Sequence, residues 1–245
     1  MATRPVFLAL DAYPWVQSEM ITFEWTPGMT KIEKQANIAA IHKQAQTQHP
    51  QIKLLEVSSK STESLGKALS AFNLQVPPNL FNLSSTRSYL SVECIYQSSK
   101  IFEHKGERKG PFQDLLTVSS KMAKQDKRLK ESGSLIAFNL AGDIWSLTPE
   151  SAFYNWLYCR SLFENDREPF GQILSYDGFT DIEFNPKKSI SNQAYACALF
   201  IALHRSGRLA EAMESKEQFL RVVYADHDVA PLHVGTQMNL FVSAT

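Results

Sequence analysis

Hydrophobic residues near the start of the chain follow the two-residue period of strands and then the wider spacing of a helix. Residues 5–11 and 20–25 are typical of strands, and the turn signal Thr26-Pro27-Gly28 ends the second one. Helical spacing follows over residues 31–46, and it predicts an apolar face made of Ile32, Ala36, Ala39 and Ala40. The chain is therefore predicted to begin with two strands and a helix.

The middle of the chain mixes strand-like and helix-like segments without a strict βαβ order. Residues 75–87 contain Pro77-Pro78 and several Asn and Ser residues, which indicates a loop. The other predicted elements are a strand at 52–57, helices at 61–69, 91–103 and 112–130, and a hairpin around Gly142 over 134–147.

The second half of the chain is predicted to be mainly helical. Thr148-Pro149 has the form of an N-cap with Pro in the first turn, and the helix is expected to run to about Phe163. A strongly apolar helix over 189–205 ends before Gly207, the residue type expected just after a helix. Shorter helices are predicted over 171–176, over 208–214 and after the capping-box sequence at 215–218. With no repeats and no linker, the pattern predicts one helix-rich α+β domain.

The composition is that of a globular chain without a dominant charge. The 245 residues are 44% hydrophobic, and 25 basic residues balance 25 acidic ones. Binding to nucleic acid would therefore require a local basic patch. No segment approaches the ~20 apolar residues of a membrane helix, and the apolar stretch at 6–10 is too short for a signal sequence. We therefore expect a cytoplasmic protein with no membrane contact.

The cysteines and histidines form no metal-binding pattern. Cys94, Cys159 and Cys197 are odd in number and far apart, which argues against disulfides and zinc, and their apolar neighbours predict buried thiols. The six histidines are scattered, and His227 and His233, in a late polar segment, are only minor ligand candidates. We therefore expect neither a metal nor a cofactor.

The predicted helix 91–103 contains the best candidates for chemistry. Glu93, Gln97 and Lys100 are spaced by four and three residues, which places them on one helix face within about 10 Å. Ser91 fits an N-cap, so Glu93 falls in the first turn, where the helix dipole favours an ionised carboxylate. Such an anion can stabilise an oxocarbenium ion or activate water during glycosidic cleavage. Lys100 can bind phosphate, or form a Schiff base with an opened sugar if its pKa is lowered. The same spacing also occurs on ordinary solvated helix faces.

Other charged and aromatic residues have two interpretations each. Basic residues concentrate between Lys100 and Lys130, as a phosphate-contacting patch or as a solvated helix face. Asp181 and Glu183 would share one face of an extended segment, or form a charged turn. The aromatic residues that can stack on bases or belong to the core are Tyr89, Tyr96, Trp145 and Trp156.

Two stretches of the sequence resemble the NADAR (YbiA-like) family. The first combines LSAFNL at 69–74 with YLSVECIYQSSKIF at 89–102, which is similar to the family's L-S-N-F element and its Y-x-S-x-E-H-x-x-Q-x-x-K-F helix. The second runs from DIEF at 181–184 to SNQA at 191–194 and resembles the closing acidic element and the Asn before the last core helix. Cys94 stands where the motif has His, and the family's Gly-rich stretch before the closing Asn is missing.

Membership of this family would imply a helix-rich α+β fold. The expected organisation is a single domain over 1–245, with a core at about 52–206, an N-terminal β/α extension and a C-terminal helix/strand tail. The sequence as a whole, including the segments FEW at 23–25 and FNPKKS at 184–189, is similar to NADAR proteins paired with DarT-type DNA ADP-ribosyltransferase toxins.

The resemblance also implies an activity, partners and site residues. It implies hydrolysis of an N-glycosidic bond, and in the toxin-paired branch the substrate is ADP-ribose on guanine in DNA and the protein is the antitoxin. The expected partners are the ADP-ribose moiety and ADP-ribosylated DNA, with a DarT-like toxin as a candidate protein partner. The resemblance assigns catalysis to Glu93 and Lys100. It assigns substrate binding to Phe72, Asn73, Tyr89, Gln97, Asp181, Glu183 and Asn192.

Two alternatives stay open at the level of sequence. One is an N-glycosidase of a small nucleotide metabolite, because other YbiA-like proteins are thought to act on riboflavin intermediates. The other is a module that binds ADP-ribose or a toxin without turnover. Activity on modified DNA, activity on the free metabolite and tight binding without turnover distinguish the three.

Overall fold

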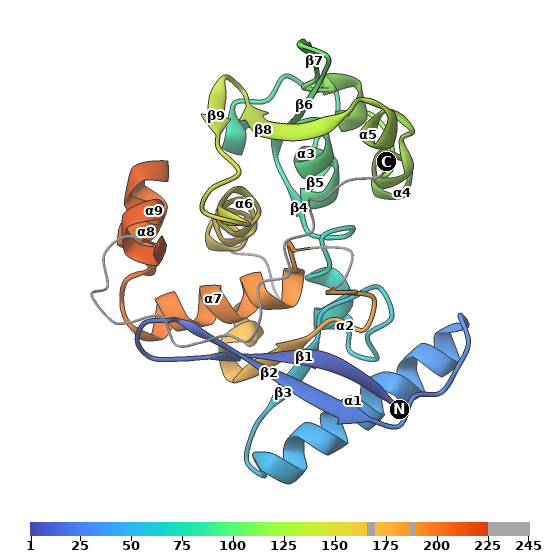
Figure 1. Cartoon of the computed structure of the whole chain (residues 1–245). Helices are drawn as coiled ribbons and strands as arrows, with labels where there is room; N and C mark the ends of the chain where they lie inside the picture. The colour runs from blue at the N-terminus through green and yellow to red at the C-terminus, as the bar shows by residue number, and fades with distance from the viewer. Residues whose placement is uncertain (166–169, 187–189, 225–245) are drawn as a thin grey trace.

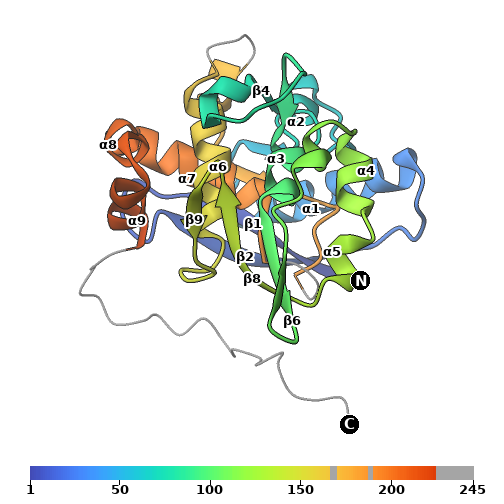
Figure 2. The ribbon, with the colours of Figure 1, turned by 90° about the horizontal axis from the view of Figure 1, so that it is seen from above.

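The computed structural model describes residues 1–165, 170–186 and 190–224, and its architecture is mixed α+β with more helix than strand, as predicted. Figure 1 shows one sheet low in the molecule with α1 against it, a second sheet at the top with α3, α4 and α5, and α6 and α7 between them. In the view from above, α8 and α9 lie on the side opposite α4 and α5 (Figure 2).

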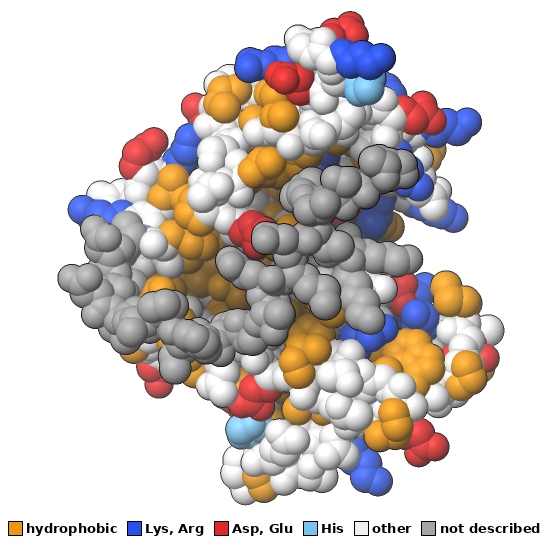
Figure 3. All heavy atoms as spheres, viewed as in Figure 1, with side chains coloured by type: hydrophobic (Ala, Val, Ile, Leu, Met, Phe, Trp, Pro, Cys, Tyr) orange, Lys and Arg blue, Asp and Glu red, His pale blue; other side chains and the backbone are white. Residues whose placement is uncertain are grey.

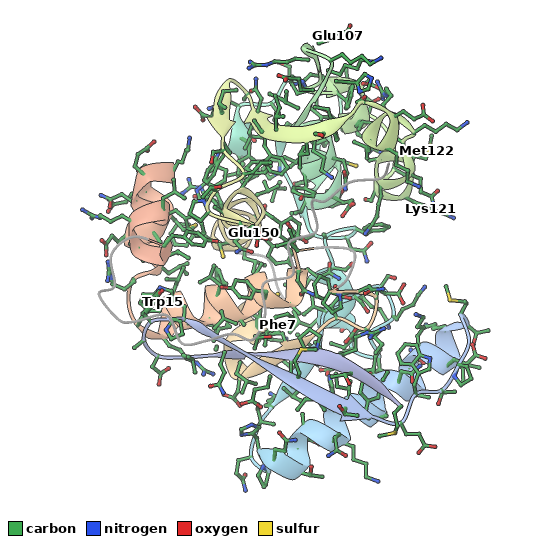
Figure 4. All side chains as sticks on the ribbon, viewed as in Figure 1. Phe7, Trp15, Glu107, Lys121, Met122 and Glu150 are labelled. Carbon is green, nitrogen blue, oxygen red and sulfur yellow. The ribbon has the colours of Figure 1, made fainter. Side chains whose placement is uncertain are left out.

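The first sheet has the order β2-β1-β10-β3, with bounds Val16–Phe23, Ala2–Ala9, Gly178–Thr180 and Leu54–Glu56. β1 pairs antiparallel with both β2 and β10, whereas β10 pairs parallel with β3. Side chains alternate along β1, so Val6 and Leu8 pack in one cluster with α1 while Phe7 faces the other side and contacts Tyr195 of α7. Figure 4 shows Phe7 between the sheet and α7. The predicted strands at 5–11, 20–25 and 52–57 are confirmed with shifted ends.

The helix α1 (Lys31–Gln48) is confirmed, but its predicted apolar face is wrong. Ile32 is 79% exposed, whereas Ile38, Ile41 and Ala45 pack on the sheet together with Val6 and Leu8. The buried face also includes two polar residues, Lys34 and Asn37. Asn37 bonds both ways with the backbone of Thr26, so a polar side chain occupies a core position because it has partners. Counting only apolar residues therefore selected the wrong side of the helix.

The second sheet has the order β7-β6-β8-β9, with bounds Glu107–Lys109, Lys100–His104, Ser134–Leu140 and Asp143–Trp145. The hairpin around Gly142 is confirmed. The single helix predicted over 91–103 is wrong in its second half, because α3 (Val92–Ser98) ends and the chain continues as β6. Partners outside the helix take over: Phe112 N–H donates to the Ser98 carbonyl, and Asn139 N–H donates to the Ser99 carbonyl. Strand pairing with β8 thus overrides local helix spacing.

The helix predicted over 112–130 is broken into η2 (Gln113–Leu116), α4 (Ser120–Gln125) and α5 (Arg128–Glu131). Ser119 starts α4 by accepting a hydrogen bond from Met122 N–H, and Asp126 ends it in an extended conformation. Arg128 then bonds to the carboxylates of both Asp114 and Asp126, which fixes the turn between the pieces. The predicted basic helix face is thus interrupted by caps that periodicity did not reveal.

The core between the sheets is built on α6 (Ala152–Phe163) and α7 (Gln193–Arg205). The prediction that Thr148-Pro149 begins α6 is wrong. The first helical residue is Ala152, and it follows Ser151, whose φ is +60°. The predicted end of α7 is confirmed, with Gly207 at φ +72°. The helices α8 (Leu209–Glu214) and α9 (Lys216–Tyr224) pack beside α6, and the Trp15 indole donates to the Val222 carbonyl of α9.

The short elements complete the frame of the cavity described next. α2 (Ser64–Ala68) and the two-stranded sheet of β4 (Gln75–Val76) and β5 (Leu90–Ser91) precede α3, with the 3-10 turn η1 (Pro78–Phe81) inside the predicted loop. A further 3-10 turn, η3 (Phe170–Ser175), lies where a short helical turn was predicted. All three cysteines are free and buried, as predicted. No helix among the described residues is long and apolar enough to cross a membrane.

Candidate functional site

A cavity of about 540 Å³ lies between the second sheet with its helices and the edge of the first sheet. Figure 3 shows the surface hollowed between the parts of the molecule that carry α4 and α1, with acidic and basic side chains at the edge. The lining comes from α3 and β6, from α4 and α5, from the loop after β3, from the segment after α2, from Tyr154 of α6, and from the segment between β10 and α7. Residues far apart in sequence therefore meet at one place.

Glu93 lies on the wall formed by the first turn of α3. Ser91 caps this helix by accepting a hydrogen bond from Cys94 N–H, so both predicted positions at the helix start are confirmed. The Glu93 side chain is 5% exposed, and its Oε1 accepts a 2.8 Å hydrogen bond from Gln97 Nε2. Its backbone N–H donates to the Ala71 carbonyl, which ties α3 to the segment after α2. The carboxylate is thus held at a fixed place on the cavity wall.

Lys100 lines the same cavity from the first residue of β6. Its Nζ lies 4.7 Å from the centre of the Tyr96 ring. Burial lowers the pKa of Lys100 to about 8, Glu93 opposes this by favouring the charged amine, and Lys124 adds to the lowering. A minority of the amine is therefore neutral near pH 7, so Lys100 can act as a cation or as a nucleophile.

Asp181 lines the opposite wall, after β10. Burial and the nearby Glu56 carboxyl together raise the pKa of Asp181 to about 8. Hydrogen bonds from Glu183 N–H and the Gln193 side chain and the charge of Lys124 partly oppose this shift. Near pH 7 this carboxyl is mostly protonated, so it can donate a proton. Glu93 and Asp181 thus differ in environment, as catalytic acid pairs do.

Glu56, at the end of β3, is a fully buried carboxyl behind Asp181. Its oxygens accept hydrogen bonds from the hydroxyls of Ser58 and Thr180 and from Ile182 N–H. Burial raises its pKa, and these hydrogen bonds partly oppose the shift. Thr180 also bonds to His42 of α1 at 2.8 Å. Glu56 therefore connects α1 and both strand ends to the cavity wall.

The close approach of α2 to the backbone of Glu56 depends on Gly66. A Cβ at that position would lie 2.0 Å from the Glu56 carbonyl oxygen and 2.5 Å from Ser61 Oγ. Glycine is therefore the residue that lets α2 pack against the end of β3.

Charged and aromatic side chains form the rim and the wall between Glu93 and Asp181. Glu183 pairs with Lys34 of α1 at 3.0 Å, and Lys124 Nζ lies 5.1 Å from the centre of the Phe72 ring. Tyr96 packs edge-on against Tyr154, with ring centres 5.0 Å apart. Burial raises the pKa of Tyr96 to about 12, so its hydroxyl stays protonated and can donate. The cavity thus offers cations, hydroxyls and flat apolar surface to one ligand.

Six of the nine residues predicted for the site line this cavity. They are Phe72, Glu93, Gln97, Lys100, Asp181 and Glu183. Asn73, Tyr89 and Asn192 are not part of its lining. Asn73 is exposed and donates to the Lys67 carbonyl. Tyr89 lines a second hollow, and Asn192 caps α7 by accepting from Ala194 and Tyr195 N–H. The roles of all nine residues in binding and catalysis stay predictions.

Sequence reasoning missed several residues of the cavity. Lys124 was visible only as one of many basic residues, and Gln193 only as part of a motif. Gln193 links three segments of the cavity wall. Its Nε2 donates to Asp181 and to the Val57 carbonyl, and its Oε1 accepts from Ala71 N–H. Glu56 was hidden in the apolar strand sequence LLEV, where a single carboxyl within a buried run was the available signal.

Cys94, which stands at the motif's His position, does not face the cavity. It is buried in a small cluster with Leu115 and Ala123, and its thiol donates to the Val118 carbonyl.

The basic residues predicted between Lys100 and Lys130 do not form one continuous patch. Lys124 lines the cavity, Arg128 is paired with acids, and Arg108 lies on β7 beside Glu103. His227 and His233 lie outside the described residues.

The part of the chain that the structure describes has no group of three or more His, Cys, Asp or Glu side chains suited to a metal ion. Trp145 is buried in the core, whereas Tyr96 is on the cavity wall. The cavity lining offers three carboxyls, from Glu93, Asp181 and Glu183, together with an amine of lowered pKa at Lys100 and hydroxyl and amide groups.

A family model described as DarT1-associated NADAR antitoxin matches residues 2–231 of the chain. The match includes β1, β2 and α1, which lie before the segment 52–206 that was predicted as the core. The core boundaries themselves stay a prediction. No functionally curated protein matches the chain significantly.

Proposed function

The chain belongs to the family of DarT1-associated NADAR antitoxins, and from this membership and the cavity we propose that it is an N-glycosidase that removes ADP-ribose from guanine bases in DNA. The observation that supports the proposal best is the pairing, across one cavity, of Glu93 on α3 with Asp181 after β10. One carboxyl is fixed by a hydrogen bond at a helix start, and burial raises the pKa of the other to about 8. Glycosidic cleavage uses two carboxyls in different protonation states.

In the proposed reaction, water adds to the anomeric carbon of the ribose as the bond from that carbon to guanine breaks. Protonated Asp181 donates its proton to the leaving base, and Glu93 stabilises the positive charge on the sugar and accepts a proton from the water. The products are ADP-ribose and unmodified guanine. Proton exchange with solvent restores both carboxyls.

Lys100 and Lys124 have distinct roles in this proposal. Lys124, beside the Phe72 ring at the rim, binds the diphosphate as a cation. Lys100 lies deeper, near Glu93, and either neutralises charge or attacks the opened sugar as a neutral amine. Reduction with borohydride during turnover separates these two roles, since only the second gives a stable adduct on Lys100.

The flat surface of Tyr96 and Phe72 is proposed to hold the sugar and a base of the ADP-ribose group. The hydroxyls of Ser58, Ser70 and Ser191 line the same space and suit sugar and phosphate oxygens. Because different side chains are proposed to bind the ligand and to catalyse cleavage, we expect substitutions in the binding group to change mainly KM and substitutions in the catalytic group to change mainly kcat.

The test is release of ADP-ribose from a guanine-ADP-ribosylated oligonucleotide by the wild type, by Glu93→Gln and by Asp181→Asn. We expect each variant to lose at least 100-fold in kcat, as general acid–base groups typically do. Glu103→Gln, on β6 but outside the cavity lining, is the matched control and should retain most activity. The proposal is wrong if the wild type releases no ADP-ribose. Activity on a free nucleotide metabolite alone would favour the metabolite glycosidase.

We also propose that the protein protects cells from the toxin of its family's name. The measurement is survival of cells that produce a DarT1 toxin together with the wild type or Glu93→Gln. Rescue by the wild type alone supports reversal of the modification, whereas equal rescue by both supports toxin binding without turnover.

A further inference from the structure

A second hollow of about 500 Å³ lies next to the cavity, around the N-terminal side of α3 and α4. Its lining is uniformly polar, with one cation, one amide and six hydroxyl groups and no acidic side chain. The lining residues are Gln75, Thr86, Arg87, Ser88, Tyr89, Ser91, Ser119 and Ser120. Tyr89, which the sequence motif singled out, belongs here and not in the cavity.

The two hollows share one wall. Ser120 Oγ lies 2.8 Å from Ser91 Oγ and donates at 2.8 Å to the Phe72 carbonyl, while the Phe72 side chain lines the cavity. On α4, Ser120 faces the second hollow and Lys124, four residues later, faces the cavity. Four residues are one helical turn, or about 6 Å. On the other side, Ser91 and Glu93 are only two residues apart.

We infer that the second hollow binds the DNA strand beside the modified guanine, holding a phosphate of a flanking nucleotide on Arg87 and its neighbouring hydroxyls. This inference rests on the proposed function. A guanine whose sugar adduct occupies the cavity remains joined to its strand, so the strand must lie against the adjacent surface. The second hollow is adjacent, and its chemistry is that of a phosphate site.

The lining has the groups that commonly contact nucleic-acid backbones. Arg, Ser, Thr, Tyr and Gln side chains make most of the contacts to phosphate and sugar oxygens. Arg87 NH1 donates to the Val118 carbonyl at 2.8 Å, which fixes the guanidinium at the hollow. A guanidinium has five N–H groups, and this bond uses one. Tyr89 is 41% exposed and lines the same hollow as Arg87, so it offers an aromatic ring on which a flanking base can stack.

The surroundings favour an anion as well. Lys121 follows Ser120 on α4 and extends away from the body of the molecule, as Figure 4 shows. The chain as a whole has no net charge, so attraction of a polyanion here is local.

The experiment compares two substrates that share the ADP-ribosylguanine group, a modified single-stranded oligonucleotide and the modified free nucleoside. For Arg87→Ala we expect KM for the oligonucleotide to rise about tenfold, the value of one charge-assisted hydrogen bond, with kcat unchanged. KM for the nucleoside should not change. The salt dependence of oligonucleotide binding should also weaken by about 0.7 in log–log slope, as for loss of one contact to a single strand.

A second variant guards against a local folding defect at Arg87. Thr86→Glu adds a carboxylate to the hollow and removes no described contact, and it should also raise KM for the oligonucleotide only. Arg108→Ala is the matched control, because Arg108 is an exposed arginine on β7, outside the linings of both hollows.

Four outcomes would overturn the inference: no change for either substrate, an equal loss for both, no effect of Thr86→Glu, or an equal effect of Arg108→Ala. Failure of the proposed function has a different signature, because the wild type would then cleave neither substrate. That result would overturn both proposals.

Discussion

At the scale of single residues, the cavity concentrates groups whose proton affinity is set by burial and by neighbours. Asp181 and Lys100 both have a pKa of about 8, reached from opposite directions, because burial disfavours the charged form of each. Glu56 adds a second buried carboxyl behind Asp181. Such groups cost folding free energy, and sites that keep them commonly exchange stability for activity.

Stability should show this cost for Asp181. The folded pKa of about 8 is above the usual aspartate value of 3.8, so its contribution to stability is fully present below about pH 4 and is lost as pH rises through 8. Asp181→Asn removes the ionisation and should therefore stabilise the protein at pH 8.5 by about 2 kcal/mol, after allowance for solvent at the cavity wall. Thermal melting at pH 4 and pH 8.5 measures this, and an equal effect at both pH values would contradict it.

The pH dependence of turnover should identify the proton donor. If protonated Asp181 donates, kcat falls as pH rises through about 8. Glu56→Gln removes a carboxylate that raises the pKa of Asp181, so the falling limb should move to lower pH. Glu56 is not among the main causes of the pKa shift of Lys100. A falling limb that does not move in Glu56→Gln would therefore point to Lys100 as the titrating group. Kinetic profiles of the two proteins between pH 5 and 10 give the answer.

At the scale of elements, the junction of α3 and β6 decides where Lys100 lies. A continuous helix would have placed Glu93, Gln97 and Lys100 along one face, and the sequence predicted that arrangement. The observed strand brings Lys100 to the same cavity by another route, through pairing with Phe138 of β8. The predicted proximity therefore holds although the predicted element does not.

This junction depends on Gly110, which lies against the backbone of Lys100. A Cβ at Gly110 would lie 2.2 Å from the Lys100 carbonyl oxygen, whereas at Gly106 it would meet nothing within 4 Å, and both residues have positive φ. We expect Gly110→Ala to cost about 2 kcal/mol more than Gly106→Ala and to lower kcat at least tenfold. Chemical denaturation and turnover of the two variants test this pair, and equal losses would show that only the shared backbone strain matters.

The corrected face of α1 gives a second matched pair. Ile41 is 1% exposed and Ile32 is 79% exposed on the same helix. We expect Ile41→Ala to reduce the free energy of unfolding by about 2–5 kcal/mol and Ile32→Ala to change it by less than about 0.5 kcal/mol. Urea unfolding curves of both variants are sufficient, and the reverse order would restore the face predicted from sequence.

At the scale of the whole molecule, the N-terminal elements are part of the frame that holds the cavity. β1 pairs with β10, whose end carries Asp181, and α1 reaches the site through Lys34 and Glu183 and through His42 and Thr180. The family match also includes this region. The elements predicted as an extension thus support the wall that bears the proposed proton donor.

A chain limited to residues 52–206 should therefore not fold cooperatively. It would leave Leu54 and Ile182 without the residues of β1, β2 and α1 that cover them. We expect a broad thermal transition and dye binding typical of exposed apolar surface, compared with a single sharp transition for the full chain. A sharp transition of the short chain would show that the predicted core is self-sufficient.

The sequence by itself determined the fold class, three of the four strands of the first sheet, the hairpin around Gly142, the cap at Ser91 and six residues of the cavity. These features depend on local signals such as periodicity, caps, turns and a motif. Tertiary structure alone decided which face of α1 is buried, that Lys100 begins a strand, and that Glu56 and Gln193 support Asp181. Each of these depends on partners distant in sequence, because a buried polar group is tolerated only where such partners satisfy it.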